Sequence, residues 1–252
     1  MSLRESKKRE EAEFPALFAD KIETDWGMLF YMEENRDSYD GNHAFLYPER
    51  LKSLESALEE IKEFYISKGI RPSLYHPDKD GYFAENADVF AKCGYELSPY
   101  ETHRVMLLAE ENTLNENPEL GIRELKNWNE RLASDILLPS GEPLEIIPLK
   151  KMMESPASRV FAAFIGEKAV GYTNIHISAY GNTRFDYVVT AKDMRGKGVG
   201  GSIISHAADC CRKRALPCPW QWAGPSESLC HKAGFRESFV IPGGYANYTG
   251  RV

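Results

Sequence analysis

Residues 188–201 read VVTAKDMRGKGVGG, and the fold prediction depends on this stretch. A β-branched run predicts the end of a strand, a glycine-rich turn follows, and an amphipathic helix is predicted over residues 199–214. Such a turn presents several backbone N–H groups at the positive end of a helix dipole, which suits a phosphate or a diphosphate. Arg195 and Lys197 add charged donors beside it. The stretch therefore predicts an anion-binding cradle between a strand and a helix.

Three other interpretations of this turn fit less well. Gly196-x-Gly198-x-x-Gly201 matches the dinucleotide fingerprint G-x-G-x-x-G, but that fingerprint also needs an acidic residue about 20 residues further on. The next predicted strand ends in Trp222-Ala223-Gly224, which contains no carboxylate. The G-x-x-x-x-G-K-S/T pattern of a Walker A loop is absent. A helix start without a ligand leaves so many glycines unexplained, because each one costs backbone entropy.

Around this turn, the second half of the chain alternates between strand and helix patterns. The turn between its second and third strands has hairpin chemistry, which indicates antiparallel pairing. Strands are predicted at 121–125, 160–165, 168–177, 184–190, 219–222 and 235–241, and further helices near 129–138 and at 227–233. The sequence thus predicts an α/β fold with a mixed, mostly antiparallel central sheet flanked by helices.

The first half repeats this alternation on a smaller scale. A helix is predicted over 51–65, then a strand over 70–75, a short helix before Cys93-Gly94-Tyr95, and a strand over 102–108. Residues 89–96 and 229–237 share a helix end, Lys-x-Gly and an aromatic residue, which suggests an internal duplication.

The domain boundary is predicted within residues 109–118, because Glu, Asn, Thr and Pro dominate there. This gives a smaller related α/β domain at 1–112 and a second domain at 119–252. The polar start of the chain, residues 1–13, is expected to be frayed.

Two motifs at compatible spacing resemble the GNAT superfamily of N-acetyltransferases. Arg195-x-x-Gly198-x-Gly200 is similar to the R/Q-x-x-G-x-G/A signature, and residues 226–235 are similar to the closing S-x-x-L-x-x-K-x-G-F element. The resemblance covers residue 121 to the C-terminus, and residues 220–235 resemble the branch that includes zwittermicin-resistance acetyltransferases. The first half has FLYPER at 45–50 where the signature would stand, so it resembles a degenerate copy that has lost the cradle.

This resemblance implies acetyl transfer from acetyl-coenzyme A, the co-substrate, to a primary amine of a small molecule. The diphosphate would bind the cradle, and the pantetheine would pair with the preceding strand. Ser226 precedes a predicted helix and can cap it. In the family this position often touches the phosphate arm, so a cap alone and a cap that also binds the coenzyme both stay open. The implied coenzyme-binding residues are Val189, Thr190, Arg195, Gly196, Lys197, Gly198, Val199, Gly200, Gly201 and Ser226.

The catalytic residues are less clear from the sequence. A base must remove a proton from the amine, and Asp186 is the first candidate, with Glu227 as the second. Asp186 could equally face solvent or pair with Arg184. The tyrosine that many family members use as the acid is replaced by Cys230, which could donate a proton or simply be buried. A non-catalytic acyl-coenzyme A binding or sensing protein is therefore the alternative function.

Composition limits the remaining classes. The 252 residues have a net charge of −7, which argues mildly against a nucleic-acid or membrane partner. No apolar run approaches the ~18–20 residues of a spanning helix, and no signal peptide is visible. The five cysteines form no CxxC pair, which predicts a reducing, cytoplasmic location. The histidines show no metal-ligand spacing, so no metal is predicted. A homodimer stays open.

Overall fold

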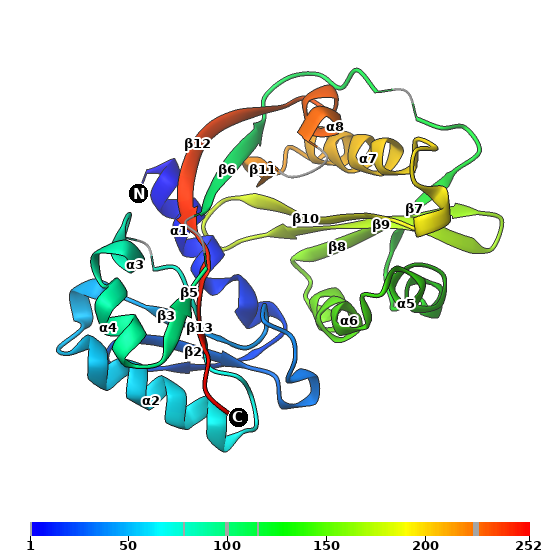
Figure 1. Ribbon diagram of the computed structural model, residues 1–252. Helices are drawn as coiled ribbons and strands as arrows, with labels where there is room; N and C mark the ends of the chain where they lie inside the picture. Colours follow the sequence, from blue (N-terminus) through cyan, green and yellow to red (C-terminus); the bar gives the residue numbers. More distant parts are fainter. Residues whose placement is uncertain (1, 78, 99–100, 115, 224–226) are drawn as a thin grey trace. The chain divides into compact units, whose positions relative to one another are not determined.

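A computed structural model describes residues 2–77, 79–98, 101–114, 116–223 and 227–252 (Figure 1). The chain forms two compact units, and each takes residues from both ends of the sequence. Unit 1 contains Met1–Glu10 and Arg104–Phe239, and unit 2 contains Glu11–His103 and Val240–Val252. The sequence-based division at 112 and 119 differs from this one, because residues 104–112 lie in unit 1.

Unit 1 is built on a seven-stranded sheet with the order β12-β6-β11-β10-β9-β8-β7. The strands β7 to β10 form an antiparallel meander, β10 and β11 are parallel, and β11 and β6 are antiparallel. This confirms the predicted mixed, mostly antiparallel sheet. The bounds are β6 Glu101–Leu108, β7 Gly121–Leu125, β8 Ser158–Ile165, β9 Lys168–Ile177, β10 Thr183–Thr190, β11 Pro219–Trp222 and β12 Phe235–Gly243.

Helices cover both faces of this sheet: α7 (Val199–Lys213) and α8 (Glu227–Lys232) lie on one side, and α5 (Leu138–Ser140) and α6 (Ile146–Glu154) on the other (Figure 1). The apolar face of α7 is fully buried, with Ile203, Ile204 and Ala207 at 0% exposure. The helix predicted near 129–138 is instead a π-helical turn, η4 (Leu132–Leu137), which continues into α5. Pro143–Glu145 forms the short 3-10 helix η5 before α6.

The start of the chain is not frayed, contrary to the expectation, but forms α1 (Leu3–Glu13). Within unit 1, Lys7 is 0% exposed and its Nζ lies 4.7 Å from the centre of the Trp220 ring. The Trp220 Nε1–H donates to Glu10 Oε2 over 2.9 Å. Burial lowers the pKa of Lys7 to about 8. The buried face of α1 carries charged residues that satisfy one another and an indole, so a hydrophobicity pattern does not show it.

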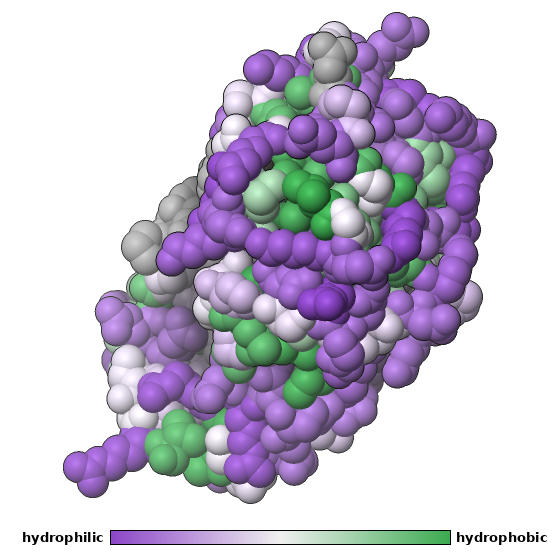
Figure 2. Space-filling model, turned by 90° about the vertical axis from the view of Figure 1, so that its right-hand side faces the viewer, coloured by the Kyte–Doolittle hydropathy of each residue, from purple (hydrophilic) through white to green (hydrophobic). Residues whose placement is uncertain are grey.

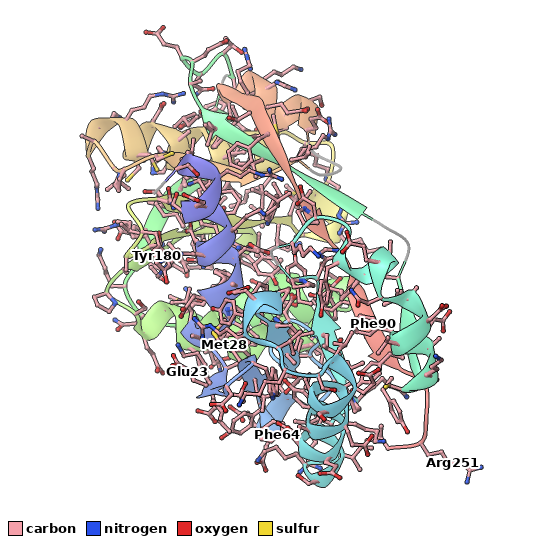
Figure 3. All side chains as sticks on the ribbon, turned by 90° about the vertical axis from the view of Figure 1, so that its left-hand side faces the viewer. Glu23, Met28, Phe64, Phe90, Tyr180 and Arg251 are labelled. Carbon is pink, nitrogen blue, oxygen red and sulfur yellow. The ribbon has the colours of Figure 1, made fainter. Side chains whose placement is uncertain are left out.

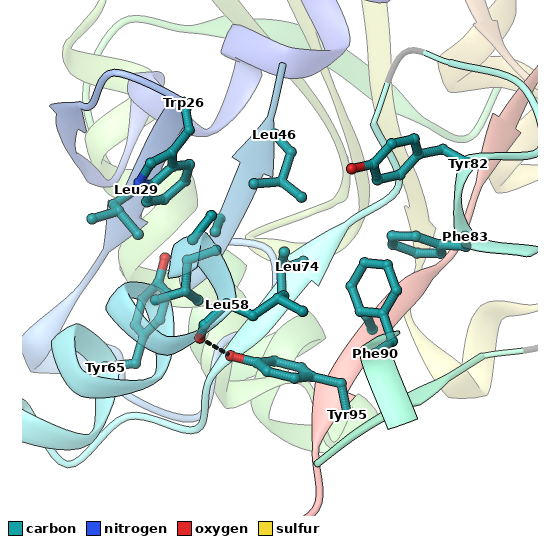
Figure 4. Close-up of a cluster of buried hydrophobic side chains, with 14 of the residues drawn as sticks. Trp26, Leu29, Leu46, Leu58, Tyr65, Leu74, Tyr82, Phe83, Phe90 and Tyr95 are labelled. Atoms are coloured by element: carbon teal, nitrogen blue, oxygen red, sulfur yellow. Dashed lines mark hydrogen bonds between the residues drawn. The ribbon is translucent and has the colours of Figure 1, made fainter. Parts of the chain in front are cut away.

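Unit 2 has a six-stranded sheet with the order β1-β2-β3-β4-β13-β5. Leu58 and Ile61 of α2 and Phe90 of α4 are 0% exposed, and Tyr95 Oη donates to Leu58 O over 3.1 Å (Figure 4). Phe90 of α4 belongs to the buried core of unit 2, and Phe64 of α2 packs against this core (Figure 3). The bounds are η1 Phe14–Leu17, β1 Asp20–Glu23, β2 Gly27–Tyr31, η2 Glu33–Asn35, β3 His43–Leu46, η3 Pro48–Arg50, α2 Leu54–Ser67, β4 Ser73–Tyr75, α3 Tyr82–Glu85, α4 Ala87–Lys92, β5 Tyr95–Leu97 and β13 Tyr245–Tyr248.

The six strands of the sheet in unit 2 have the same order as six of the seven strands in unit 1, where β7 is the additional strand. In each, a helix connects two parallel strands, β3–α2–β4 in unit 2 and β10–α7–β11 in unit 1. In each, the next strand of the sheet comes from elsewhere in the chain: β13 lies between β4 and β5, and β6 lies between β11 and β12. β6 follows β5 in the chain but belongs to the sheet of unit 1. In the same way, β13 follows β12 but belongs to the sheet of unit 2. This common order supports the predicted duplication.

The segment predicted as a linker is bonded to unit 1. The amides of Ala109 and Glu110 donate to Gly234 O over 2.9 and 3.0 Å, and the amide of Thr113 donates to Lys232 O over 2.8 Å. Its described residues contain no regular helix or strand. Composition alone suggested a linker, but these backbone bonds hold the segment against the end of α8.

The surface in Figure 2 is mostly hydrophilic, with apolar residues gathered in a few places. This agrees with a mean hydropathy of −0.45. In the described part of the chain, no helix has both the length and the apolar composition that crossing a membrane requires.

Candidate functional site

The parallel strands β10 and β11 separate part-way along β10. Within the described residues they pair only at Thr183 with Pro219 and at Arg184 with Trp220. A β-bulge against β9 follows between Asp186 and Val188, and Tyr187 in this bulge has a φ of 50°. Residues 182–186 are buried, whereas residues 187–190 are half-buried. The C-terminal end of β10, residues 187–190, therefore has one backbone edge without a strand partner among the described residues, next to an accessible surface.

Beyond β10, the short 3-10 helix η6 (Lys192–Met194) leads into an extended Arg195 and then two glycines with left-handed backbones. Gly196 has a φ of 78° and Gly198 a φ of 79°. A Cβ built on either would meet no atom within 4 Å. These glycines are thus required by the backbone conformation, which L-residues adopt at a cost, and they leave open space in front of the loop.

The N-terminus of α7 exposes its backbone donors. The helix begins at Val199, its N-cap is Gly198, and no side chain caps it. Its first intrahelical bond runs from Ser202 N to Gly198 O over 3.0 Å, so the N–H groups of residues 199–201 have no acceptor within the helix. A Cβ on Gly200 would come within 3.2 Å of Thr190 Oγ1. The first turn therefore packs closely against β10 while its N–H groups point outward.

The charges around this terminus favour an anion. The first turn of α7 contains no acidic residue. Arg195 and Lys197 are both exposed, and neither forms an ion pair among the described residues. The loop before α7 thus combines two exposed cationic residues with the positive end of a helix dipole and with N–H groups that have no acceptor in the helix, and phosphate groups bind at such helix termini in proteins.

Comparison with known families agrees with this geometry. Residues 122–235 match the acetyltransferase (GNAT) family. Unit 1 therefore contains a GNAT-family domain. The matched segment begins in β7 and ends at the start of β12, so it includes the separated strands and the cradle but neither β6 nor α1.

Solved structures with the same fold cover 82–99% of the chain, which is more than the segment that matches the family. A GCN5-related N-acetyltransferase from Kribbella flavida has a TM-score of 0.67 at 12% identity and covers 99% of this chain and 97% of its own. One from Sphaerobacter thermophilus has a TM-score of 0.56 at 12% identity, with 93% and 77% covered. A tandem GNAT protein from the clavulanic acid biosynthesis pathway has 0.54 at 12% identity, with 82% and 76% covered. A search of curated sequences found no match.

In the GNAT domain, Asp186 is buried beside Arg184. The Asp186 side chain is 9% exposed, and its Oδ1 accepts from Arg184 Nη2 over 3.2 Å and from Nε over 3.4 Å. Of the two alternatives to a catalytic role, the ion pair is present and the solvent-facing carboxylate is not. His176 lies opposite Arg184 on β9, and burial, followed by Arg184, lowers its pKa to about 4.

Cys230 and Glu227 lie on α8 in different surroundings. Cys230 is 3% exposed within a core that includes Phe185 and Phe235, and burial raises the pKa of its thiol to about 11. Glu227 accepts from Arg104 Nη1 over 3.0 Å, which lowers the pKa of its carboxyl, and lies 3.5 Å from His231 Nε2. Glu227 thus links α8 to β6. Ser226 lies outside the described residues.

Two features of the site were not found from the sequence. The φ of Tyr187 depends on the bulge, which arises from the pairing of β10 with β9. Arg104 was assigned to the first domain, yet it holds α8 from within the sheet. No local sequence signal points to either. Among the described residues, no group of three or more His, Cys, Asp or Glu side chains is arranged to hold a metal.

Proposed function

We propose that this protein transfers the acetyl group of acetyl-coenzyme A to a primary amine of a small molecule, in the cytoplasm. The observation that carries the proposal is the first turn of α7, where uncapped N–H groups follow Gly198 and lie beside the strand edge that β10 leaves unpaired. A diphosphate fits the first feature and an extended pantetheine arm fits the second.

The residues present fit the coenzyme in the order that this geometry gives. Lys197 to Gly201 would hold the diphosphate by backbone N–H groups, with the Arg195 and Lys197 side chains as charged donors. Val189 and Thr190 would pair with the pantetheine arm. Continuing along β10 leads to the bulge at Tyr187, so the acyl end would lie there. The coenzyme supplies a thioester that is activated toward an amine.

The polypeptide would bind the amine close to this point and manage its protons. Backbone N–H groups at the bulge would stabilise negative charge on the carbonyl oxygen, a contact worth ~2.7–4 kcal/mol in enzymes where it has been removed. Asp186, the carboxylate of β10 beside the bulge, would act as the base, although its ion pair with Arg184 weakens it as a proton acceptor. Cys230 is a poor acid here, because its buried thiol has a raised pKa.

A non-catalytic acyl-coenzyme A binding or sensing protein is the second candidate. The burial of Cys230 and the engagement of Asp186 by Arg184 favour it, since both remove proton-transfer groups from the expected places. The cradle serves both functions equally. Unit 2 would in either case be a GNAT-like copy without a cradle, since FLYPER at 45–50 precedes its helix.

Two measurements test these functions together. Isothermal titration calorimetry and thermal unfolding with acetyl-coenzyme A measure binding, and release of the coenzyme thiol across a panel of small amines measures turnover. Binding with turnover supports the transferase. Binding without turnover for any amine supports the sensor. If no heat is released and the melting temperature does not rise, both functions are wrong.

A further inference from the structure

The residues between β6 and β7 pass along the first two turns of α7. Asn112 bonds to the Ser205 side chain in the second turn. Leu114 packs over the first, where a Cβ on Gly201 would lie 3.7 Å from its Cδ2. Asn117 reaches the loop in front of the helix. The segment thus runs from the second turn of α7 back to its N-terminus.

We infer that Asn117 is a positioning residue for the cradle, which it holds in the shape that binds the coenzyme. The inference rests on the proposed coenzyme site. The Asn117 backbone N–H donates to Ser202 Oγ over 2.8 Å, and its Nδ2 donates to Lys197 O over 3.3 Å. Ser202 Oγ in turn donates to Gly198 O over 3.0 Å. Asn117 and Ser202 therefore fix two successive carbonyl groups of the cradle loop.

Fixing these carbonyls aims the N–H groups of the cradle. In a trans peptide, the C=O and the following N–H point in opposite directions within one rigid plane. The bond to Lys197 O therefore sets the direction of the Gly198 N–H, and the bond to Gly198 O sets that of the Val199 N–H. The bond to Lys197 O is exposed and comes from a side chain, and the bond to Gly198 O comes from within the helix. In each peptide plane the N–H therefore points away from the residue that holds its carbonyl.

The loop needs such support because of its glycines. Gly196 and Gly198 flank Lys197, and glycine permits many backbone conformations. Asn117 has restraints of its own: its Oδ1 accepts from Glu119 N over 3.0 Å, and Pro118 restricts its backbone to extended conformations. Its bonds to the loop would limit the conformations of the glycines before binding, which reduces the ordering cost of binding an anion.

The test compares Asn117→Asp with Asn112→Asp. Asn117→Asp is nearly isosteric and keeps the Oδ1 acceptor, but it replaces the Nδ2 donor with an oxygen that faces Lys197 O. Asn112→Asp makes the same chemical change in the same segment, at a residue that contacts Ser205 and not the cradle carbonyls. Asn117→Ala serves as a second variant, because it removes the donor without adding a charge and keeps the backbone bond to Ser202.

We expect Asn117→Ala to raise the dissociation constant of coenzyme A about 3–10-fold, Asn117→Asp to raise it more, and Asn112→Asp to leave it within twofold. The KM for acetyl-coenzyme A should rise in proportion, while kcat at saturation and the KM for the amine stay unchanged. In the protein without coenzyme, backbone amide order parameters of residues 196–199 should fall in both Asn117 variants and not in Asn112→Asp.

Wild-type affinity and order parameters in both Asn117 variants would overturn the inference, and so would an equal loss in Asn112→Asp. If the wild-type protein itself does not bind coenzyme A, the proposed function is wrong. The order parameters would then still show whether Asn117 holds the loop, so the two failures are distinguishable.

Discussion

The two helices that connect parallel strands, α7 in unit 1 and α2 in unit 2, begin in opposite ways. The N-cap of α2 is Ser53, whose side chain accepts from Ser56 N over 3.2 Å, and Glu55 lies in its first turn. The N-cap of α7 is Gly198, with no side-chain cap and no acidic residue in the first turn. The two helices occupy equivalent places in their sheets. The first-turn N–H groups are partly satisfied by a side chain in α2 and are left available in α7.

This difference shows what an anion site requires of a helix. A serine cap stabilises a helix by about 1 kcal/mol, and a first-turn carboxylate adds to this through the dipole. Both would also oppose a diphosphate, one by occupying an N–H group and the other by charge. The α7 terminus gives up this stabilisation, and a bound anion would restore it. The N-terminus of α2 retains it, because the Ser53 side chain already accepts from one of the N–H groups that a phosphate would use.

The largest effect is expected from Gly198→Val. At a φ of 79° a β-branched residue is strained, and its side chain would occupy the open space in front of the loop. We expect coenzyme affinity to fall about 100-fold, because several charge-assisted N–H bonds are lost together. Calorimetric titration with coenzyme A measures this.

Gly141→Val is the matched control for this variant. Gly141 has a φ of 83° and also meets no atom within 4 Å, but it follows α5 rather than the cradle. Both variants should lower the melting temperature to a similar extent, and only Gly198→Val should lose affinity. Equal affinities in the two variants would place the diphosphate elsewhere.

A smaller effect concerns acid stability, because both units contain buried histidines, His176 in unit 1 and His43 and His76 in unit 2. The pKa of folded His176 is about 4, below the ordinary 6.5 of the unfolded chain. Between these values only the unfolded chain binds the proton, so the free energy of unfolding falls as the pH falls, by at most about 1.4 kcal/mol per pH unit.

Denaturant titrations at several pH values from 7 to 4 give the free energy of unfolding at each pH. We expect this free energy to depend less steeply on pH in His176→Gln than in the wild type. The slope should not vanish, because burial also lowers the pKa of His43. A variant slope as steep as that of the wild type would mean that His176 titrates normally in the folded protein.

The smallest effect is expected from Ser53→Ala. Loss of the cap on α2 should lower the free energy of unfolding by about 1 kcal/mol, as measured by urea denaturation. Coenzyme affinity should not change. A change in affinity would mean that the N-terminus of α2 contributes to coenzyme binding, and the contrast between the two helices would then fail.

Local patterns were enough to predict the elements that position the site. The strand before the cradle, the helix after it and the hairpin of β8 and β9 were predicted within about two residues, because turn chemistry and periodicity are short-range signals. The glycine motif likewise predicted the turn that leads into α7, while binding of an anion there stays a prediction. The burial of Asp186 and Cys230 depends on packing between distant elements, so the sequence could not decide between their alternatives.

Other features were hidden because polar residues perform structural tasks. Lys7 and Glu10 look like part of a solvated tail, yet they pack on Trp220. Asn112 and Asn117 look like part of a linker, yet they bond to α7 and to the loop before it. Composition records that these residues are hydrophilic, and only the fold shows which backbone and side-chain groups they satisfy.

The place of β13 has a consequence for how the chain is made. Ala246 is fully buried and pairs with Leu74 on one side and Leu97 on the other, in a sheet whose other strands lie before residue 98. While the ribosome is still synthesising unit 1, β4 and β5 have no strand between them. The sheet of unit 2 can therefore be completed only after Tyr245–Tyr248 have been translated, and until then the unpaired edges of β4 and β5 are open to pairing with another chain.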